Sequence, residues 1–262
     1  MARRLYRHER LDFILKQLYE SGYVSVAELR DMLGVSAVTI RSDLDALEQA
    51  GQLLRTHGGA VPVTATEEQL SFSVRQRTNV EAKERIGAAA AQLVADGEAI
   101  VLDASTTAWH LARHLRSRRD LTVLTTGLYV ALELLRASGI SVMIPGGPVW
   151  REAAAVVGSW DRTMLEYGNL QKAFIGARGL TLEEGITDAN QEEVSLKRDI
   201  LASVSEVNVI VDASKLGKVA FATVASINEI NRVITNQEAL DDQVAAAVIS
   251  GLRERGIEVM LV

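Results

Sequence analysis

Apolar positions in the first 62 residues repeat at the three- and four-residue spacing of short helices. The spacing predicts a first helix over residues 7–22 with these inward positions: Leu11, Ile14, Leu15 and Leu18. A second helix is expected after Ser25, which stands where a helix cap belongs, and it ends at Gly34. Ser36 caps a third helix, which ends at Gly51 and has one apolar face: Ala37, Ile40, Leu44 and Leu47.

The second and third helices, joined through residues 34–36, match a helix-turn-helix pattern. The third helix has Arg41 on its flank and an outer face of mostly small, weakly charged residues: Val38, Thr39, Ser42, Asp45 and Ala46. Such a face fits a DNA groove. After it, the strand-like residues 52–56, a turn at 57–59 and a second short strand at 60–61 predict a wing.

Hydroxyl and cationic side chains of this module are candidate contacts to phosphates and base edges. An exposed Val38 can pack on a thymine methyl group, or it is an ordinary surface apolar residue. The predicted DNA contacts are Arg3, Arg4, Arg7, Ser25, Ser36, Val38, Thr39, Arg41, Ser42, Arg55 and His57. The alternative is a small helical domain that binds protein.

Residues 63–79 lack periodicity and are expected to be a linker between domains at 1–62 and 80–262. Beyond the linker, helical and strand patterns alternate, which predicts a parallel α/β sheet with crossover helices. The expected strands are 99–102, 121–124, 140–144, 172–176, 207–211, 231–235 and 257–262. The expected helices are 86–94, 107–116, 128–137, 190–204 and 239–254.

Ligands of such sheets bind outside the carboxyl ends of the strands, and those ends are polar here. Residues 103–107 end one strand and open a helix, an arrangement that suits a phosphate or provides only an N-cap. The strand ends at 125–127 and 145–147 consist of small or polar residues, which either leave the backbone accessible to a ligand or form an ordinary turn. Lys215 either contacts a ligand or pairs with a carboxylate, and Glu193 with Lys197 form an ordinary helical pair by default.

Composition narrows the classes of protein to which the chain can belong. The 262 residues include no cysteine and only four histidines, so disulfides, zinc sites and other metal sites are not expected. No apolar run approaches the length of a membrane span, and we expect a soluble cytoplasmic protein. The net charge is −6, but residues 1–62 are neutral, with eight basic and eight acidic residues. DNA binding by one copy is therefore expected to be weak, and a dimer or larger homo-oligomer is expected.

Residues 35–60 read VSxxTIRxDLxxLxxxGxLxRxHGGA, which strongly resembles the amino-terminal signature of the DeoR family of bacterial transcriptional regulators. The resemblance implies a winged helix-turn-helix that binds double-stranded operator DNA. One position differs, because family members usually have an arginine where this chain has Ser42.

The larger domain also resembles the DeoR family, in its carboxy-terminal sensor domain. The similar segments are Asp-x-Ser-Thr-Thr at 103–107, Gly146-Gly147, residues 174–177, residues 187–197 and Asp212-x-Ser214-Lys215. This resemblance implies a mostly parallel α/β fold, similar to ribose-5-phosphate isomerase, that binds a phosphorylated sugar or related metabolite. The implied effector contacts are Asp103, Ser105, Thr106, Thr107, Thr125, Thr126, Gly127, Gly146, Gly147, Lys172, Asp188, Glu193, Asp212 and Lys215, with Thr126 in place of the family's usual asparagine.

These features favour a repressor of a carbohydrate operon that needs no cofactor and responds to a phosphorylated metabolite. The first alternative is a sugar-phosphate isomerase with an accessory DNA-binding module, since carboxylates and a lysine can transfer protons. The second is a protein-interaction scaffold.

Overall fold

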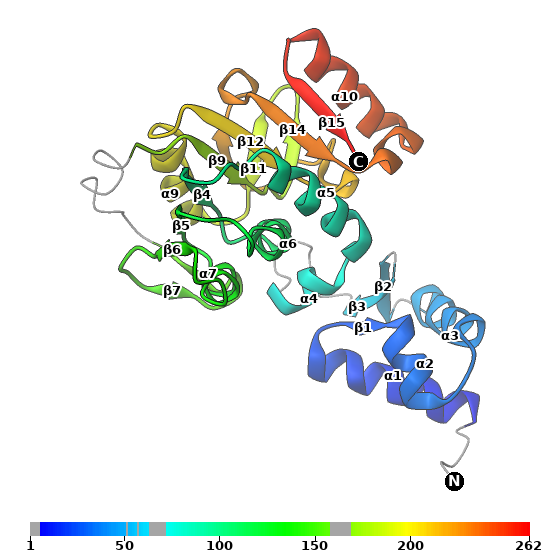
Figure 1. Ribbon diagram of the computed structural model, residues 1–262. Coiled ribbons are helices and arrows are strands. Elements are labelled where there is room, and N and C mark those ends of the chain that lie inside the picture. Colours follow the sequence, from blue (N-terminus) through cyan, green and yellow to red (C-terminus); the bar gives the residue numbers. More distant parts are fainter. Residues whose placement is uncertain (1–5, 51, 57, 63–71, 158–168) are drawn as a thin grey trace. The chain divides into compact units, whose positions relative to one another are not determined.

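The computed structural model describes residues 6–50, 52–56, 58–62, 72–157 and 169–262 (Figure 1). The chain divides into two compact units, Met1–Val80 and Glu81–Val262, here called the N-terminal and C-terminal units. Each has its own hydrophobic clusters and is described by itself. In the part of the chain that is described, no helix is long and apolar enough to cross a membrane.

Three helices and a small antiparallel sheet form the N-terminal unit: α1 (Arg7–Ser21), β1 (Val24–Ser25), α2 (Val26–Leu33), α3 (Ala37–Gln49), β2 (Leu53–Thr56) and β3 (Gly59–Pro62). The predicted helix-turn-helix and wing hairpin are confirmed. The inward positions pack into one core that includes Ile14, Leu18, Leu29, Ile40, Leu44 and Leu53. Ser25 and Ser36 cap α2 and α3, because each hydroxyl accepts a backbone N–H of the first turn.

Two elements of this unit differ from the sequence prediction. Val24 and Ser25 form a short strand that pairs with β3 before α2 begins. Helix α4 (Phe72–Arg77) lies inside the segment expected to be a linker. Val74 of α4 packs with Tyr23 and Val61, and the Tyr23 hydroxyl donates to the Arg77 carbonyl. The segment after residue 71 is therefore part of the N-terminal unit; residues 63–71 lie outside the described residues.

The C-terminal unit is built on a seven-stranded parallel sheet in the order β15-β14-β12-β9-β4-β5-β6 (Figure 1). Its strands are β4 (Ala99–Leu102), β5 (Leu121–Thr125), β6 (Ile140–Met143), β9 (Lys172–Ile175), β12 (Glu206–Ile210), β14 (Arg232–Thr235) and β15 (Glu258–Leu261). Its helices are α5 (Val80–Gln92), α6 (Thr106–His114), α7 (Leu128–Leu134), α9 (Gln191–Leu201) and α10 (Gln243–Glu254). Each predicted strand is present, and the mostly parallel α/β fold is confirmed.

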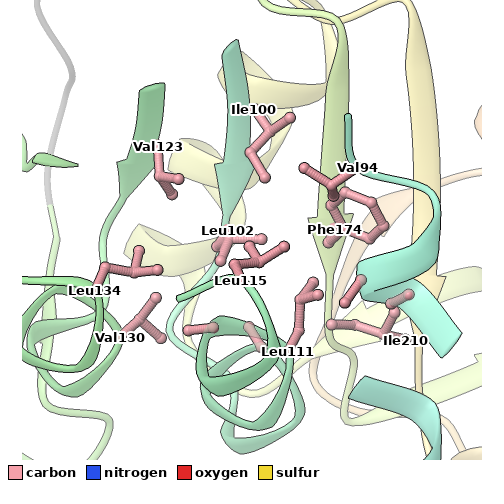
Figure 2. Close-up of a cluster of buried hydrophobic side chains, with 14 of the residues drawn as sticks. Val94, Ile100, Leu102, Leu111, Leu115, Val123, Val130, Leu134, Phe174 and Ile210 are labelled. Atoms are coloured by element: carbon pink, nitrogen blue, oxygen red, sulfur yellow. The ribbon is translucent and has the colours of Figure 1, made fainter. Parts of the chain in front are cut away.

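Helices cover both faces of this sheet. On one face, Leu102 of β4 packs in a cluster with Leu111 and Leu115, and Figure 2 shows these side chains beside Val123 and Phe174. On the other face, the neighbouring Val101 packs with Leu196 and Ile200 from the α9 side. Successive residues of a strand point to opposite faces, so strands covered on both sides are apolar without interruption.

Several short elements were not predicted. Strands β10 (Gly179–Thr181), β11 (Gly185–Asp188) and β13 (Ala222–Ala225) form a second, antiparallel sheet, and β7 (Val149–Trp150) pairs with β8 (Ala155–Val156). The 3-10 segments η2 (Ala213–Lys215), η3 (Ile227–Glu229) and η4 (Gln237–Asp241) complete the unit. The predicted helix at 239–254 begins only at Gln243, because Asp242 caps it by accepting the N–H groups of Val244 and Ala245.

Candidate functional site

The outer face of α3 presents apolar, hydroxyl and cationic groups together. Val38 is 73% exposed, and Arg41 and Ser42 are also exposed. Arg41 forms no ion pair within the described residues, so its guanidinium is available to an external anion. The Ser36 hydroxyl accepts the Thr39 N–H and lies 2.8 Å from the Thr39 hydroxyl. Ser36 and Thr39 therefore define the start of the helix as well as its outer surface.

The aspartate at position 43 is a structural residue that the sequence did not single out. Asp43 is 1% exposed and accepts hydrogen bonds from the Arg10 Nε and Nη2 atoms at 2.5 and 3.0 Å. This bidentate contact fastens α1 to α3. The exposed Arg7 Nε lies 3.7 Å from the same carboxylate. The sequence signal for Asp43 is its place on the apolar face, next to Leu44 and three residues after Ile40.

The wing arginine folds back toward α3. Arg55 Nε lies 3.4 Å from Asp45 Oδ1, and the Arg55 backbone N–H donates to Glu48. The Ser25 hydroxyl is also engaged locally, because it accepts the Glu28 N–H and donates to the Glu28 carboxylate. Three other predicted DNA contacts, Arg3, Arg4 and His57, lie outside the described residues.

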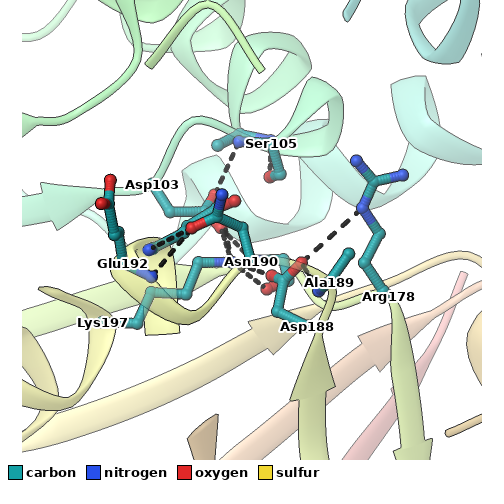
Figure 3. Close-up of polar contacts among 11 residues, drawn as sticks. Asp103, Ser105, Arg178, Asp188, Ala189, Asn190, Glu192 and Lys197 are labelled. Carbon is teal, nitrogen blue, oxygen red and sulfur yellow. Dashed lines mark hydrogen bonds and ion pairs between the residues drawn. The ribbon is translucent and has the colours of Figure 1, made fainter. Parts of the chain in front are cut away.

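In the C-terminal unit, Asp103 directly follows β4 and is 1% exposed. Its Oδ1 accepts the Ser105 N–H, while its Oδ2 accepts the Gly176 N–H and lies 3.0 Å from Lys197 Nζ (Figure 3). Both oxygens are therefore engaged within the protein. Asp103 holds the ends of β4 and β9 together and shapes the loop that opens α6.

The start of α6 combines hydroxyl groups with helix N–H groups. Ser105 caps the helix, since its hydroxyl accepts the Ala108 N–H at 3.0 Å. Thr106 and Thr107 occupy the first turn, where backbone N–H groups have no partner within the helix. The helix dipole adds partial positive charge at this point, so the first turn can bind an anion.

Lys197 is the functional-site residue that the sequence reasoning missed. It is 3% exposed, and its Nζ lies 2.6 Å from Asp188 and 3.0 Å from the Gly176 carbonyl oxygen, as well as 3.0 Å from Asp103 (Figure 3). We expected only a helical pair with Glu193, whose carboxylate lies 3.4 Å away. The available signal was spacing: Lys197 follows the buried Val194 by three residues and precedes the buried Ile200 by three, on the inner face of α9.

Electrostatics favour the charged forms of Lys197 and Asp188 despite their burial. Burial alone would lower the pKa of Lys197, but the surrounding carboxylates of Asp188, Asp103 and Glu193 raise it. Burial would raise the pKa of Asp188, but the charges of Lys197 and Arg178 outweigh it and lower that pKa. For Glu193, burial and the negative charge of Asp188 raise the pKa.

The strand end at Thr125 and Thr126 does not present the free backbone that we predicted. The Gly127 N–H donates to the Thr125 hydroxyl, and the Thr126 carbonyl accepts the Val156 N–H of β8. The next donor, the Leu128 N–H, is taken by the Ala154 carbonyl. The β7–β8 hairpin thus occupies the start of α7. Gly127 is required there, because a Cβ would stand 2.9 Å from the Ala104 Cα.

The remaining predicted contacts fall into three groups. Asp212 accepts the N–H and the hydroxyl of Ser214, and it precedes the half-buried Lys215 of η2. Gly146 and Gly147 are exposed between β6 and β7. The prediction for Lys172 is wrong: this residue begins β9 at the amino-terminal edge of the sheet, where its Nζ donates to the carboxylate of Glu98 at 2.6 Å and to the Leu93 carbonyl.

Within the described ranges, no group of three or more His, Cys, Asp or Glu side chains has a geometry that holds a metal ion.

Comparisons with known proteins match both units. A model of the DeoR-like helix-turn-helix domain matches residues 10–66, and a model of the DeoR C terminal sensor domain matches residues 78–237. The HTH-type transcriptional regulator GolR of Listeria innocua is 35% identical over 257 residues, covering 98% of this chain and 99% of that protein. The HTH-type transcriptional repressor GlcR of Bacillus subtilis is 36% identical, covering 89% and 90%.

A putative aga operon transcriptional repressor of Escherichia coli O157:H7 is 31% identical, covering 97% of this chain and 93% of its own. Among solved structures, ribose 5-phosphate isomerase A of Methanocaldococcus jannaschii aligns with a TM-score of 0.40 and 19% identity, over 53% of this chain and 55% of that chain.

Proposed function

This chain belongs to the DeoR family of DNA-binding transcriptional regulators, and we propose that it represses a carbohydrate operon in response to a phosphorylated sugar. Two features of the chain together carry the proposal: the N-terminal unit has an exposed α3 face, and the C-terminal unit has a helix start at α6 that can bind an anion. Two relatives whose names include the word repressor support repression as the mode of action. A repressor that binds operator DNA works in the cytoplasm.

Recognition of DNA rests on α3 and on cations around it. Val38, Thr39, Arg41 and Ser42 form the proposed base- and phosphate-contacting face, with Arg7 and Arg55 beside it. Because residues 1–62 have no net charge, a single copy supplies few phosphate contacts. We therefore propose binding as a homo-oligomer to an operator with repeated half-sites.

The effector site is proposed at the carboxyl ends of β4 and its neighbours. The N–H groups of Thr106 and Thr107 would bind the phosphate, and the 212–215 segment with Lys215 would bind the remainder of the ligand. Asp103, Asp188, Glu193 and Lys197 would hold these segments in place, since they mostly bind one another. This division of roles differs from the expectation that Asp103 contacts the effector directly.

A purely regulatory role is supported over isomerase activity. An aldose–ketose isomerase needs a carboxylate that faces the substrate and accepts its proton. Both oxygens of Asp103 already accept hydrogen bonds, and Asp188 is paired with Lys197 and Arg178. The purified protein should therefore leave aldose and ketose phosphates unchanged; interconversion at enzymatic rates would contradict this part of the proposal.

The test of the main proposal is fluorescence anisotropy with the full chain and DNA upstream of its own operon, across a salt series. We expect specific binding at least 1000-fold tighter than to shuffled DNA, the lower end of the usual range. Equal, weak binding to both DNAs would contradict it. Thermal-shift measurements with glucose 6-phosphate, fructose 6-phosphate, glycerol 3-phosphate and inorganic phosphate test the effector site, because a ligand at 100 times its Kd stabilises by about 2.7 kcal/mol.

A further inference from the structure

Helix α5 is the first element of the C-terminal unit, and along the chain it comes directly after the last helix of the N-terminal unit. Helix α4 ends at Arg77 and packs on the N-terminal unit through Val74, and α5 begins at Val80. Only Thr78 and Asn79 separate the two helices, and Asn79 has a φ of 52°. The chain therefore passes from α4 to α5 through two residues.

Glu84 connects α5 to α6. Its Oε2 lies 2.6 Å from His110 Nδ1 and accepts a hydrogen bond from Arg113 at 2.9 Å, while its Oε1 lies 3.0 Å from His114 Nε2. Burial lowers the pKa of His110, which is 2% exposed. Its Nδ1 is the donor in this contact, because an ionised carboxylate can only accept. Gly87 makes the helices nearly touch, because a Cβ there would lie 2.7 Å from the Leu111 N atom. Movement of α6 therefore moves Glu84.

Arg85, the next residue, connects α5 to the segment at 212–215. Its guanidinium donates to both oxygens of Glu238, at 2.5 and 2.6 Å. Glu238 also accepts a hydrogen bond from the Asn236 side-chain Nδ2 at 2.8 Å, and the side-chain Oδ1 of Asn236 accepts the Ala213 N–H at 2.8 Å. Hydrogen bonds from Asn236 and Arg85 lower the pKa of Glu238 to about 2, which keeps this contact charged.

We propose that α5 couples the effector site to the DNA-binding unit, with Glu84 responding to α6 and Arg85 responding to the 212–215 segment. The proposal rests on the proposed function, since these segments form the two halves of the proposed effector site. A ligand that binds both halves shifts α6 and η2, and both shifts act on neighbouring residues of one rigid helix. The DNA-binding unit then receives a single combined displacement.

The test uses the full chain with Glu84→Gln, which removes the charge and keeps the size of the side chain, and with Arg85→Gln, which removes the guanidinium. Glu258→Gln is the matched control, because it removes an ion pair with Arg232 elsewhere in the same unit. Arg85→Glu combined with Glu238→Arg reverses the second contact and is expected to restore it. Operator affinity is measured without ligand and with the tested phosphate that stabilises the wild-type protein most.

We expect Glu84→Gln and Arg85→Gln to keep the thermal shift with that phosphate and ligand-free operator affinity within about threefold of wild type. The ligand-induced change in operator affinity is expected to fall at least fivefold in both variants and to return in the charge-reversed pair. An unchanged ligand response in both variants, or an equal loss in Glu258→Gln, would overturn the proposal.

Hydrogen exchange of the ligand-free protein gives a readout that does not depend on the effector. Glu84→Gln is expected to speed exchange in the first turns of α6, and Arg85→Gln at residues 213–216, while Glu258→Gln changes neither. If none of the four phosphates stabilises the wild-type protein, the effector-site proposal is contradicted, and hydrogen exchange alone tests the coupling through α5. In that case, exchange rates that change only within α5 would overturn the coupling proposal.

Discussion

At the scale of single residues, the charged side chain of Lys197 connects several strand ends of the C-terminal unit. Its ammonium joins the ends of β4, β9 and β11 through Asp103, the Gly176 carbonyl and Asp188. A buried charge is stable only while its partners remain, because removing one leaves the others uncompensated. The cluster therefore ties the shape of the proposed effector site to the stability of the unit.

Lys197→Met is expected to destabilise the protein by about 3–5 kcal/mol, because Asp103 and Asp188 lose their shared cation. Urea unfolding followed by circular dichroism measures the loss. Lys172→Met is the control, because this lysine of the same unit is partly exposed and contacts one carboxylate, that of Glu98, and the Leu93 carbonyl. We expect it to cost about 1 kcal/mol. Equal losses in the two variants would contradict the central role of Lys197.

Glu193 makes stability depend on pH. Its pKa in the folded protein is raised above the ordinary value of 4.5 by burial and by Asp188. The folded state therefore holds this proton at pH values where the unfolded state has lost it, so stability falls as the pH rises above 4.5 through the folded pKa. Glu193→Gln cannot ionise and is expected to lose this part of the pH dependence.

Urea unfolding of wild type and Glu193→Gln at several pH values between 4 and 8 tests this expectation. Relative to wild type, the variant should be more stable at pH 8 than at pH 4, since only the wild type is destabilised by ionisation there. A constant difference between the two proteins across this range would show that Glu193 has an ordinary pKa. Glu192→Gln, an exposed neighbour, is the control and should leave the profile unchanged.

At the scale of elements, α3 illustrates how one helix serves stability and recognition from opposite faces. Ile40, Leu44 and Leu47 are buried, and Asp43 on the same side binds Arg10 of α1. The outward side holds Val38, Arg41 and Ser42. The inner face thus fixes the helix in the unit, while the outer face is free to vary without loss of the core.

Ser42→Arg is expected to strengthen binding to operator DNA, because Ser42 is exposed and the new guanidinium adds a phosphate contact. The slope of log affinity against log salt should become steeper by about 0.9 per copy. Anisotropy titrations over a range of salt concentrations measure both effects. Ser250→Arg adds the same charge on α10 in the other unit and should leave the slope unchanged. An unaltered slope in Ser42→Arg would place this position away from the DNA.

At the scale of the whole molecule, the extent of the N-terminal unit differs from the boundary expected at residue 62. Helix α4 contributes Val74 to a cluster with Tyr23 and Val61, and Arg77 forms an ion pair with Glu28 at 3.1 Å. A unit that ends before α4 loses these contacts. The residues between α4 and α5 are then only Thr78 and Asn79.

A fragment of residues 1–79 is expected to be more stable than one of residues 1–66, because only the longer fragment keeps α4. Burial of one Val or Phe side chain contributes about 1.5–3 kcal/mol, so we expect a rise in Tm of several degrees. Thermal unfolding by circular dichroism compares them. The Val74→Ser variant of the longer fragment should lose most of the difference. Identical Tm values for the two fragments would show that α4 adds no stability.

Local patterns were sufficient for much of this fold. Helices α1, α2 and α3 and the strands of the parallel sheet follow from spacing, caps and apolar runs, all of which act within a few residues. Strands β10, β11 and β13 escaped prediction because they are set by pairing with one another, and β11 pairs with β13 across the intervening α9 and β12. Helix α4 escaped because it is short and lies in a polar segment.

Family membership and the position of the proposed anion-binding helix start were evident from residues adjacent in the chain, such as 35–60 and 103–107. The partners of each charge were decided only by the tertiary structure. Asp103 bonds Gly176, which is 73 positions away, and Lys197 joins both, whereas Lys172 lies at the opposite edge of the sheet. Charges interact through distance in space and through burial, and neither quantity can be obtained from spacing along the chain.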